Sequence, residues 1–148
     1  MSRLEAVGIE SRRFKLEQGL PGREDYLAGY ADIDIVLDTF PHPGATTTCE
    51  AMWMGVPTVT LGGETMLSRI GASMLTCAGL SEWVAWREDE YVALAIKHAQ
   101  DVSGLTRLRR EMRGRVAETA LFDAKRFAPQ LEHALLDIWQ GRVKCSAG

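Results

Sequence analysis

The chain has 148 residues, of which 46% are hydrophobic and 25% are charged, so one folded domain with a sizeable core is expected. Lys and Arg number 17 against 20 Asp and Glu, and the formal net charge of −3 excludes long-range attraction to nucleic acid or to an anionic membrane surface. The apolar runs are far shorter than the roughly 20 residues that span a bilayer, and charges interrupt the opening "MSRLEAVGIESRR". We therefore expect a cytoplasmic protein with no membrane or nucleic-acid partner.

Predicted strands and helices alternate along the first part of the chain, after an opening that resembles the end of a helix. The predicted strands, in chain order, are Arg13–Gln18, Ile33–Phe40, Val56–Gly63 and Trp83–Trp86. The predicted helices between them are Arg23–Ala31, Thr46–Met54 and Met66–Ala78. The second and third strands are short, rich in β-branched residues and bounded by turn residues, while the last two helices stop at glycines.

The last third of the chain shows apolar residues only at helical spacing, which predicts three closing helices. The first stripe is Val92, Ala95, Ile96 and Ala99; the second is Leu105, Leu108, Met112 and Val116; the third is Phe127, Leu131, Leu135 and Ile138. The basic residues beside them are interleaved with acidic ones, so we expect a solvated helix face. These basic residues are Arg107, Arg109, Arg110, Arg113, Arg115, Lys125 and Arg126.

The order of elements predicts an α/β fold. Strands too apolar to leave one face wet favour a parallel sheet covered by helices on both faces, that is, a doubly wound, Rossmann-like sheet that closes with three helices. We find no repeat, low-complexity tract or linker, so residues 1–148 are predicted to form a single domain.

The stretch "FPHPGATTTCEAMWMG" joins the second predicted strand to a helix that begins at Thr46. The first N–H groups of a helix have no intrahelical partner, and with the helix dipole they favour an anion at the carboxyl end of the strand. Gly44 and Ala45 would let a diphosphate approach the backbone, while Thr46 and Thr47 would add hydroxyl donors. This pattern indicates a candidate phosphate site.

Glu50 lies one turn into the same helix, where it can accept a hydrogen bond from a sugar hydroxyl, as an acidic residue does toward ribose in other nucleotide folds. A second interpretation of the stretch stays open. In that interpretation one threonine is simply the N-cap of the helix, since Thr is a common cap and a single Gly-containing turn is weak evidence of a phosphate site. The local pattern does not decide between these interpretations.

Several short motifs follow one another in a fixed order between Asp34 and Ala85. They are LDT, a Gly-x-Thr-Thr turn, an acidic residue three positions after the second Thr, W-x-G-x-P, GET and SR-x-x-AS. In these motifs the chain resembles the C-terminal catalytic region of the O-linked N-acetylglucosamine transferase family, including its bacterial and SPINDLY-like members. Weaker similarity continues to "FDAKRFAPQLEHALLDIW", so the resemblance covers nearly the whole chain.

The resemblance implies an inverting glycosyltransferase of the two-Rossmann-domain, or GT-B, type. This chain would be the C-terminal half, which holds the UDP-sugar, and a missing N-terminal domain would present the acceptor. By position, Thr46 and Thr47 would meet the diphosphate, and Glu50 would face the ribose. The implied reaction is transfer of a GlcNAc-like sugar from UDP to a hydroxyl, such as a protein Ser or Thr, with no metal or organic cofactor.

The sequence departs from the family pattern at three positions. Ala45 stands where many members have His or Gly, and Tyr26 and Gly29 stand where animal relatives have His and Arg near the nucleotide. The family's Lys-bearing first strand and its N-terminal domain with tetratricopeptide repeats have no counterpart in these residues. We therefore assign no general base, and we expect the chain alone to bind UDP weakly and to transfer nothing.

Two alternatives to the transferase interpretation stay open. The first is a noncatalytic module that forms a homodimer or binds a partner protein through apolar surface that truncation would leave exposed. The second is a sugar-nucleotide epimerase-like enzyme of the same architecture, which the spacing of the motifs matches less well.

Three further residues near the predicted site have more than one interpretation each. Arg69 could contact a phosphate or form an ion pair with Glu64 or Asp38. His42 could donate to a phosphate oxygen or to the transferred sugar, or lie in solvent as a turn residue. Cys49 could have its thiol pKa lowered by the helix dipole, or pack as a small buried residue.

The three cysteines, which also include Cys77 and Cys145, lack disulfide or zinc spacing, so we expect reduced thiols and no metal site.

Overall fold

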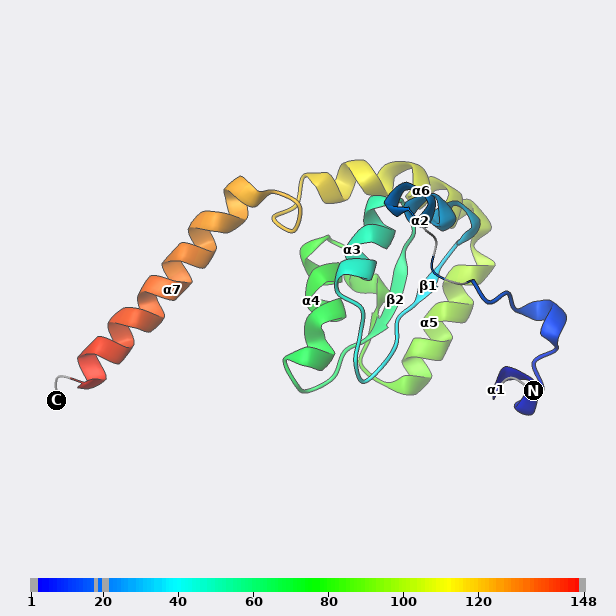
Figure 1. Cartoon of the computed structure of the whole chain (residues 1–148), viewed down its shortest axis with the longest axis horizontal. Helices are drawn as coiled ribbons and strands as arrows, with labels where there is room; N and C mark the ends of the chain where they lie inside the picture. The colour runs from blue at the N-terminus through cyan, green and yellow to red at the C-terminus, as the bar shows by residue number, and fades with distance from the viewer. Residues whose placement is uncertain (1–2, 18, 20–21, 147–148) are drawn as a thin grey trace.

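The computed structural model describes residues 3–17, 19 and 22–146. It contains a three-stranded parallel sheet in the order β1-β2-β3 (Figure 1), formed by β1 (Val36–Leu37), β2 (Thr58–Leu61) and β3 (Val84–Ala85). Val36 pairs with Thr58 and Thr60 pairs with Val84. The prediction of an α/β fold with a parallel sheet is confirmed.

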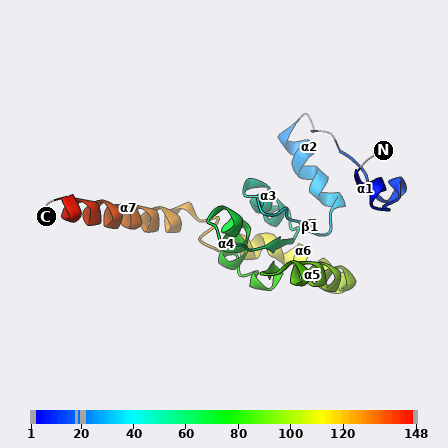
Figure 2. The ribbon, with the colours of Figure 1, turned by 90° about the horizontal axis from the view of Figure 1, so that it is seen from below.

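Helices connect the strands and close the chain. They are α1 (Arg3–Ala6), α2 (Arg23–Ala28), α3 (Thr46–Trp53), α4 (Ile70–Cys77), α5 (Glu88–Gln100), α6 (Val102–Ala117) and α7 (Ala124–Ser146). Helical turns of the 3-10 type lie at Ser11–Arg13, Gly29–Asp32, Leu67–Arg69 and Ser81–Trp83. The crossover helices α3 and α4 lie on one side of the sheet and α5 on the other (Figure 2), which places the sheet between two helical layers.

The main core forms where these layers meet. Its fully buried members come from the sheet, α3, α4 and α6, and include Met52, Val59, Leu75, Met112 and Val116, each at most 1% exposed. Burying an aliphatic side chain of this size contributes about 1.5–3 kcal/mol. A second cluster of Tyr30, Ala51 and Val56 fixes α3 against the segment that precedes β1. The carboxyl ends of β1 and β2 are thereby held in a rigid frame.

The strand predicted at Arg13–Gln18 is wrong for the residues that the structure describes. Residues 11–13 form a 3-10 turn, residues 14–17 have no strand partner, and Leu16 is 75% exposed. Gln18 lies outside the described residues. A strand needs a neighbouring strand to satisfy its backbone N–H and C=O groups. Residues 14–17 have none, because β1 pairs only with β2 among the described strands.

The three closing helices are confirmed, but the predicted apolar stripe faces the core only in α6. In α6 the predicted stripe does pack on the core, with Met112 and Val116 buried. In α5 the stripe residues Val92 and Ile96 are 55% and 54% exposed, and the neighbouring Tyr91 packs on the core instead. Periodicity alone therefore locates these helices without fixing which side faces inward.

Helix α7 extends away from the sheet (Figures 1 and 2). Its apolar stripe is exposed: Phe127, Leu131, Leu135, Ile138 and Trp139 are between 46% and 68% accessible. Among the described residues, no helix combines the length and the hydropathy needed to cross a membrane. The stripe of α7 is therefore not packed against this sheet.

Candidate functional site

The loop between β1 and α3 (residues 38–45, here the β1–α3 loop) lies at the carboxyl end of β1. Its first residue, Asp38, accepts a hydrogen bond from the Gly44 amide through Oδ1 at 2.7 Å. Thr39 Oγ1 donates to the His42 carbonyl at 2.7 Å, and Tyr91 Oη from α5 donates to the Asp38 carbonyl at 2.9 Å. Two of these bonds lie within the loop and the third joins it to α5, so groups of the protein itself hold the loop in place.

Helix α3 starts at Thr46, as predicted, and its first amides point out of the helix end. The first intrahelical bond runs from the Cys49 amide to the Ala45 carbonyl at 3.1 Å. Within the described residues, no group accepts a hydrogen bond from the amides of Thr46, Thr47 or Thr48, and Ala45 supplies no side-chain cap. The interpretation of one threonine as the N-cap is therefore wrong, because Ala45 occupies that position. The helix end offers free donors.

The side chains of the threonine run divide between solvent and core. Thr46 and Thr47 are exposed, so their hydroxyls are available to a ligand, whereas Thr48 is 1% exposed and packs inward. Ala45 is also exposed and presents only a methyl group at the N-cap. The predicted donors Thr46 and Thr47 thus lie together on an open surface beyond the end of β1.

Gly44 is held by the loop itself, and its predicted role of letting a diphosphate approach the backbone stays a prediction. Its amide is already bonded to Asp38, so it is not a free donor for a phosphate. A Cβ at this position would lie 2.4 Å from Thr47 Oγ1, closer than real Cβ atoms come, and 3.0 Å from Thr48 Oγ1, a tight contact. Glycine is needed here because the loop packs against the threonine hydroxyls.

Residues of α2 and of the turn after it contact α3 at Glu50 and at the Thr47 carbonyl. The Glu50 carboxylate is 12% exposed and lies 3.4 Å from Arg23 Nη2, whose side chain is 74% exposed. Tyr26 Oη lies 3.1 Å from Tyr30 Oη, and Tyr30 donates to the Thr47 carbonyl at 3.3 Å. Burial is the main cause that raises the pKa of Tyr30, so this phenol stays protonated and can donate.

His42 and Arg69 are not part of this group. His42 is exposed, and its backbone carbonyl rather than its ring takes part in the loop. Arg69 Nε donates to the Gly63 carbonyl at 2.7 Å, and no ion pair joins Arg69 to Glu64 or Asp38 in the described part of the chain. The ion-pair interpretation of Arg69 is therefore wrong: it fastens the loop after β2.

Cys49 fits the packing interpretation, whereas Cys77 is exposed. Cys49 and Cys77 are free thiols, and burial raises the pKa of Cys49, so the helix dipole does not make it a reactive thiolate. The side chain of Cys145 lies outside the part that the structure describes. In that described part, no three His, Cys, Asp or Glu side chains are placed to hold a metal ion.

The basic residues of α6 contact protein more than predicted. Arg113 lies over the ring of Trp53, with Cζ 4.6 Å from its centroid, and Arg115 donates to the Gly79 carbonyl at 3.3 Å. Arg109 donates to the carbonyls of Ile33 and Tyr30 at 2.7 and 2.8 Å. Arg109 thus departs from the predicted solvated face, whereas Arg113 and Arg115 are exposed as expected and also contact protein.

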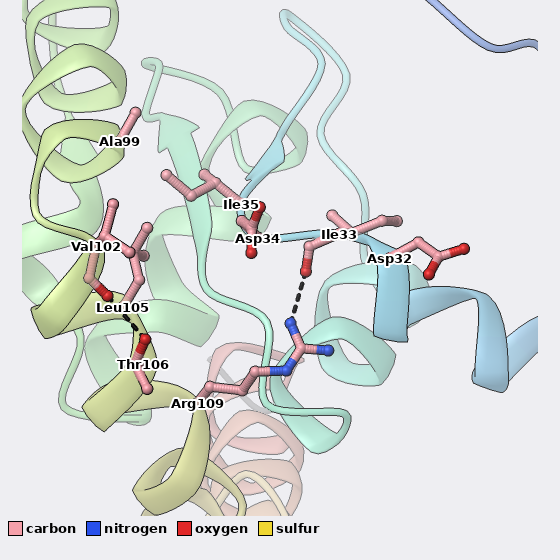
Figure 3. Close-up of a pocket in the computed structure, with 9 residues that line it drawn as sticks. All are labelled: Asp32, Ile33, Asp34, Ile35, Ala99, Val102, Leu105, Thr106 and Arg109. Carbon is pink, nitrogen blue, oxygen red and sulfur yellow. Dashed lines mark hydrogen bonds between the residues drawn. The ribbon is translucent and has the colours of Figure 1, made fainter.

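Arg109 also lines a cavity of about 550 Å³ at the amino end of β1 (Figure 3). Its walls are mainly apolar, from Ile33, Ile35, Val102 and Leu105, and the Arg109 guanidinium is already bonded to carbonyl groups. Ligands of open α/β sheets bind at the carboxyl ends of the strands. We therefore place the candidate site at the β1–α3 loop and not in this cavity.

Four residues of the site region escaped the sequence-based prediction: Arg23, Tyr30, Asp38 and Tyr91. A signal was present for Arg23, because a basic residue in the first turn of a helix opposes the helix dipole and so suggests a specific partner. Asp38 stands at the end of an apolar strand, which also indicates a specific role. Tyr30 and Tyr91 act over long sequence separations that no local pattern shows.

The model of glycosyl transferase family 41 matches residues 2–131. The chain belongs to this family. Two relatives are named probable UDP-N-acetylglucosamine–peptide N-acetylglucosaminyltransferase SPINDLY: that of Petunia hybrida is 42% identical over 95% of this chain, and that of Arabidopsis thaliana is 41% identical over 97%. A Caenorhabditis elegans UDP-N-acetylglucosamine–peptide N-acetylglucosaminyltransferase is 30% identical over 87% of the chain.

A solved structure of an O-GlcNAc transferase mutant from Thermobaculum terrenum superposes with a TM-score of 0.85 at 38% identity. The match covers 97% of this chain and 27% of the Thermobaculum terrenum chain. The chain spans only 15%, 16% and 12% of the petunia, Arabidopsis and nematode relatives. The resemblance drawn from the motifs is confirmed, and the chain is homologous to part of a family of UDP-N-acetylglucosamine–peptide transferases.

Proposed function

We propose that this chain is the UDP-sugar-binding part of an inverting GT-B type glycosyltransferase. The sugar is GlcNAc-like, the donor is its UDP derivative, and the acceptor is a hydroxyl, as in a protein Ser or Thr. The names of the relatives support the donor and the peptide acceptor, and the TM-score of 0.85 supports the Rossmann-like C-terminal half. No general base is assigned among the described residues, so this part binds the donor and does not by itself complete the reaction.

The observation that carries the proposal is the open amino end of α3. Among the described residues, the amides of Thr46, Thr47 and Thr48 lack protein acceptors, and the Thr46 and Thr47 residues are exposed. Free amides at a helix start, together with the dipole, form a site for an anion. The diphosphate of UDP fits this chemistry because it carries charge on oxygens that only accept hydrogen bonds.

The neighbouring side chains suit the nucleoside end of such a ligand. The Glu50 carboxylate can accept from a ribose hydroxyl, and Arg23 lies next to it with an exposed guanidinium that can turn to an anion. Tyr26 is 37% exposed and supplies an aromatic surface and a hydroxyl beside this pair. These roles are our assignments by position and chemistry.

The chemical contribution of the site is stabilisation of the leaving group. When the sugar–phosphate bond breaks, negative charge grows on the UDP oxygen, and fixed donors stabilise that charge more than they stabilise the bound donor substrate. One well-placed donor of this kind can be worth about 3 kcal/mol. The β1–α3 loop is already bonded in place, so little reorganisation is needed.

Isothermal titration of the whole chain with UDP, UDP-GlcNAc and ADP tests the proposal. We expect UDP and UDP-GlcNAc to bind and ADP to bind more weakly. Inorganic pyrophosphate is the control for a nonspecific anion effect. If none of the nucleotides binds, the proposal fails; if ADP binds as tightly as UDP, the assignment of a uridine donor fails.

The exposed stripe of α7 favours a second candidate function, a noncatalytic module that forms a homodimer or binds another protein. Five large apolar side chains on one helix are exposed by 46–68%, which is unusual for a monomer surface. Light scattering with and without UDP separates the candidates. A tight dimer that ignores UDP, and that Leu131→Glu disrupts, supports the module; a monomer that binds UDP supports the transferase part.

A further inference from the structure

Asp38 is a nearly buried carboxylate at the junction of the sheet and the β1–α3 loop. It is 7% exposed, and all its hydrogen-bonding groups have partners. Oδ1 accepts from the Gly44 amide at 2.7 Å, and Oδ2 accepts from Thr60 Oγ1 on β2 at 2.7 Å. Its own amide donates to the Val59 carbonyl at 3.0 Å, and its carbonyl accepts from Tyr91 Oη at 2.9 Å. One residue therefore ties β1, β2, α5 and the loop together.

The carboxylate has only neutral partners. In the described part of the chain no Lys, Arg or His forms an ion pair with Asp38. Burying a charge without an opposite charge is costly, and a well-packed apolar residue could hold two strands together without that cost. The feature that an apolar residue could not supply is the acceptor for the Gly44 amide.

The orientation of the carboxylate is tightly restricted. A Cβ on Gly71, at the start of α4, would lie 2.7 Å from Asp38 Oδ2 and 2.4 Å from Thr60 Oγ1. Close approach of the α4 backbone thus holds Oδ2 on Thr60, and the geometry of the carboxylate leaves Oδ1 directed at Gly44. The acceptor for the loop is fixed from behind by two strands and a helix.

Resting on the proposed function, we propose that Asp38 is the positioning residue of the diphosphate site. By holding the Gly44 amide, it sets where the chain enters α3 and so the direction of the free amides of Thr46 and Thr47. It keeps Gly44 against the threonine hydroxyls, where a Cβ would not fit. Asp38 does not touch the ligand; it acts through the loop.

The test compares three variants of the whole chain. Asp38→Ala removes both side-chain bonds. Asp38→Asn keeps them, because its Oδ1 accepts from Gly44 and its NH2 group can donate to Thr60 Oγ1. Thr60→Val removes only the bond to Oδ2 and keeps the shape of the side chain, so it is the control for a purely structural role.

Two readouts are needed: UDP affinity by titration and protection of the Gly44 amide from hydrogen exchange by NMR. We expect Asp38→Ala to weaken UDP binding by roughly tenfold or more, the equivalent of losing one hydrogen bond to a charged group, and to expose the Gly44 amide. Asp38→Asn and Thr60→Val should keep affinity within about threefold and keep the Gly44 amide protected, even where Thr60→Val lowers the melting temperature.

Several outcomes would overturn the role of Asp38. Loss of affinity in Thr60→Val equal to that in Asp38→Ala would show that affinity follows stability alone. If Asp38→Ala does not fold, hydrogen exchange in the unaltered chain is the test. A Gly44 amide that exchanges as fast as the amides of Thr46 and Thr47 would contradict its hydrogen bond to Asp38. Absence of UDP binding to the unaltered chain would instead overturn the proposed function.

Discussion

Glu50→Ala tests the nucleoside end of the proposed site. The Glu50 carboxylate is 12% exposed and one turn into α3, and it pairs with Arg23 at 3.4 Å. We expect this substitution to remove the hydrogen bond to a ribose hydroxyl and with it the ability to distinguish UDP from deoxy-UDP. The fold should persist, because Arg23 is largely solvent-exposed and such pairs contribute less than about 1 kcal/mol.

The magnitude follows from the environment of the carboxylate. A hydrogen bond to a charged group contributes about 1.5–3 kcal/mol. The low exposure of Glu50 keeps this bond from being screened by water, but the ribose must compete with Arg23 for the carboxylate oxygens. We therefore expect the lower end of the range, about 1.5 kcal/mol, which corresponds to roughly a tenfold change in dissociation constant.

The assay is titration of the unaltered chain and of Glu50→Ala with UDP, 2′-deoxy-UDP and 3′-deoxy-UDP. The unaltered chain should prefer UDP to one of the deoxy analogues by roughly tenfold, and Glu50→Ala should lose this preference. Glu64→Ala is the control, since it removes an exposed glutamate from the loop after β2. Equal weakening of all three ligands by Glu50→Ala, or an unchanged preference, would refute the ribose contact.

Three further predictions concern the threonine hydroxyls, the hydrogen bonds of Arg109 and the effect of pH on stability. Thr46→Ala combined with Thr47→Ala should weaken UDP binding by about 1–3 kcal/mol; an unchanged affinity in titration would move the site away from this turn. Arg109→Met should lower the free energy of unfolding by about 1–3 kcal/mol, because two carbonyls lose their donor, and urea denaturation beside the exposed Arg110→Met control measures the difference. Burial raises the pKa of Tyr30 above 10, so the folded state holds this proton more tightly than the unfolded state does. Stability from this group is therefore present below pH 10 and lost as the pH rises above it, and Tyr30→Phe should remove that part of the alkaline loss in denaturation curves.

The start of α3 could be predicted from the sequence because its signals are local. A turn containing Pro and Gly ends the strand, and three threonines that favour helix starts follow at once, so the helix was expected to begin at Thr46 and does. The strand before it was expected at Ile33–Phe40 but is limited to Val36–Leu37. Apolar residues are spread over the whole predicted segment. The hydrogen bonds that define a strand depend instead on the length and position of its neighbour, β2.

The supporting residues of the site could not be predicted in the same way. Tyr91 reaches the Asp38 carbonyl across 53 positions, and Tyr30 reaches the Thr47 carbonyl across 17. Such contacts depend on how helices dock on the sheet, which a single sequence does not encode in any short pattern. Residues 44–47, which are expected to touch the diphosphate, are consecutive in the sequence, so a local pattern is enough to propose them, and their contact with a ligand stays a prediction.

The two turns of α3 have different roles: the first carries the free amides, and the second packs on the core. Its first turn leaves three amides without protein acceptors, which weakens a helix of only eight residues. Its second turn contains Ala51 and Met52, both 0% exposed, and this burial holds the helix in place from behind. Free donors can therefore be kept in a fixed direction without capping, because the energy that orders them comes from the core and not from the helix end. An anion that binds there meets donors that are already oriented, and this is the condition under which backbone amides stabilise a leaving group most strongly.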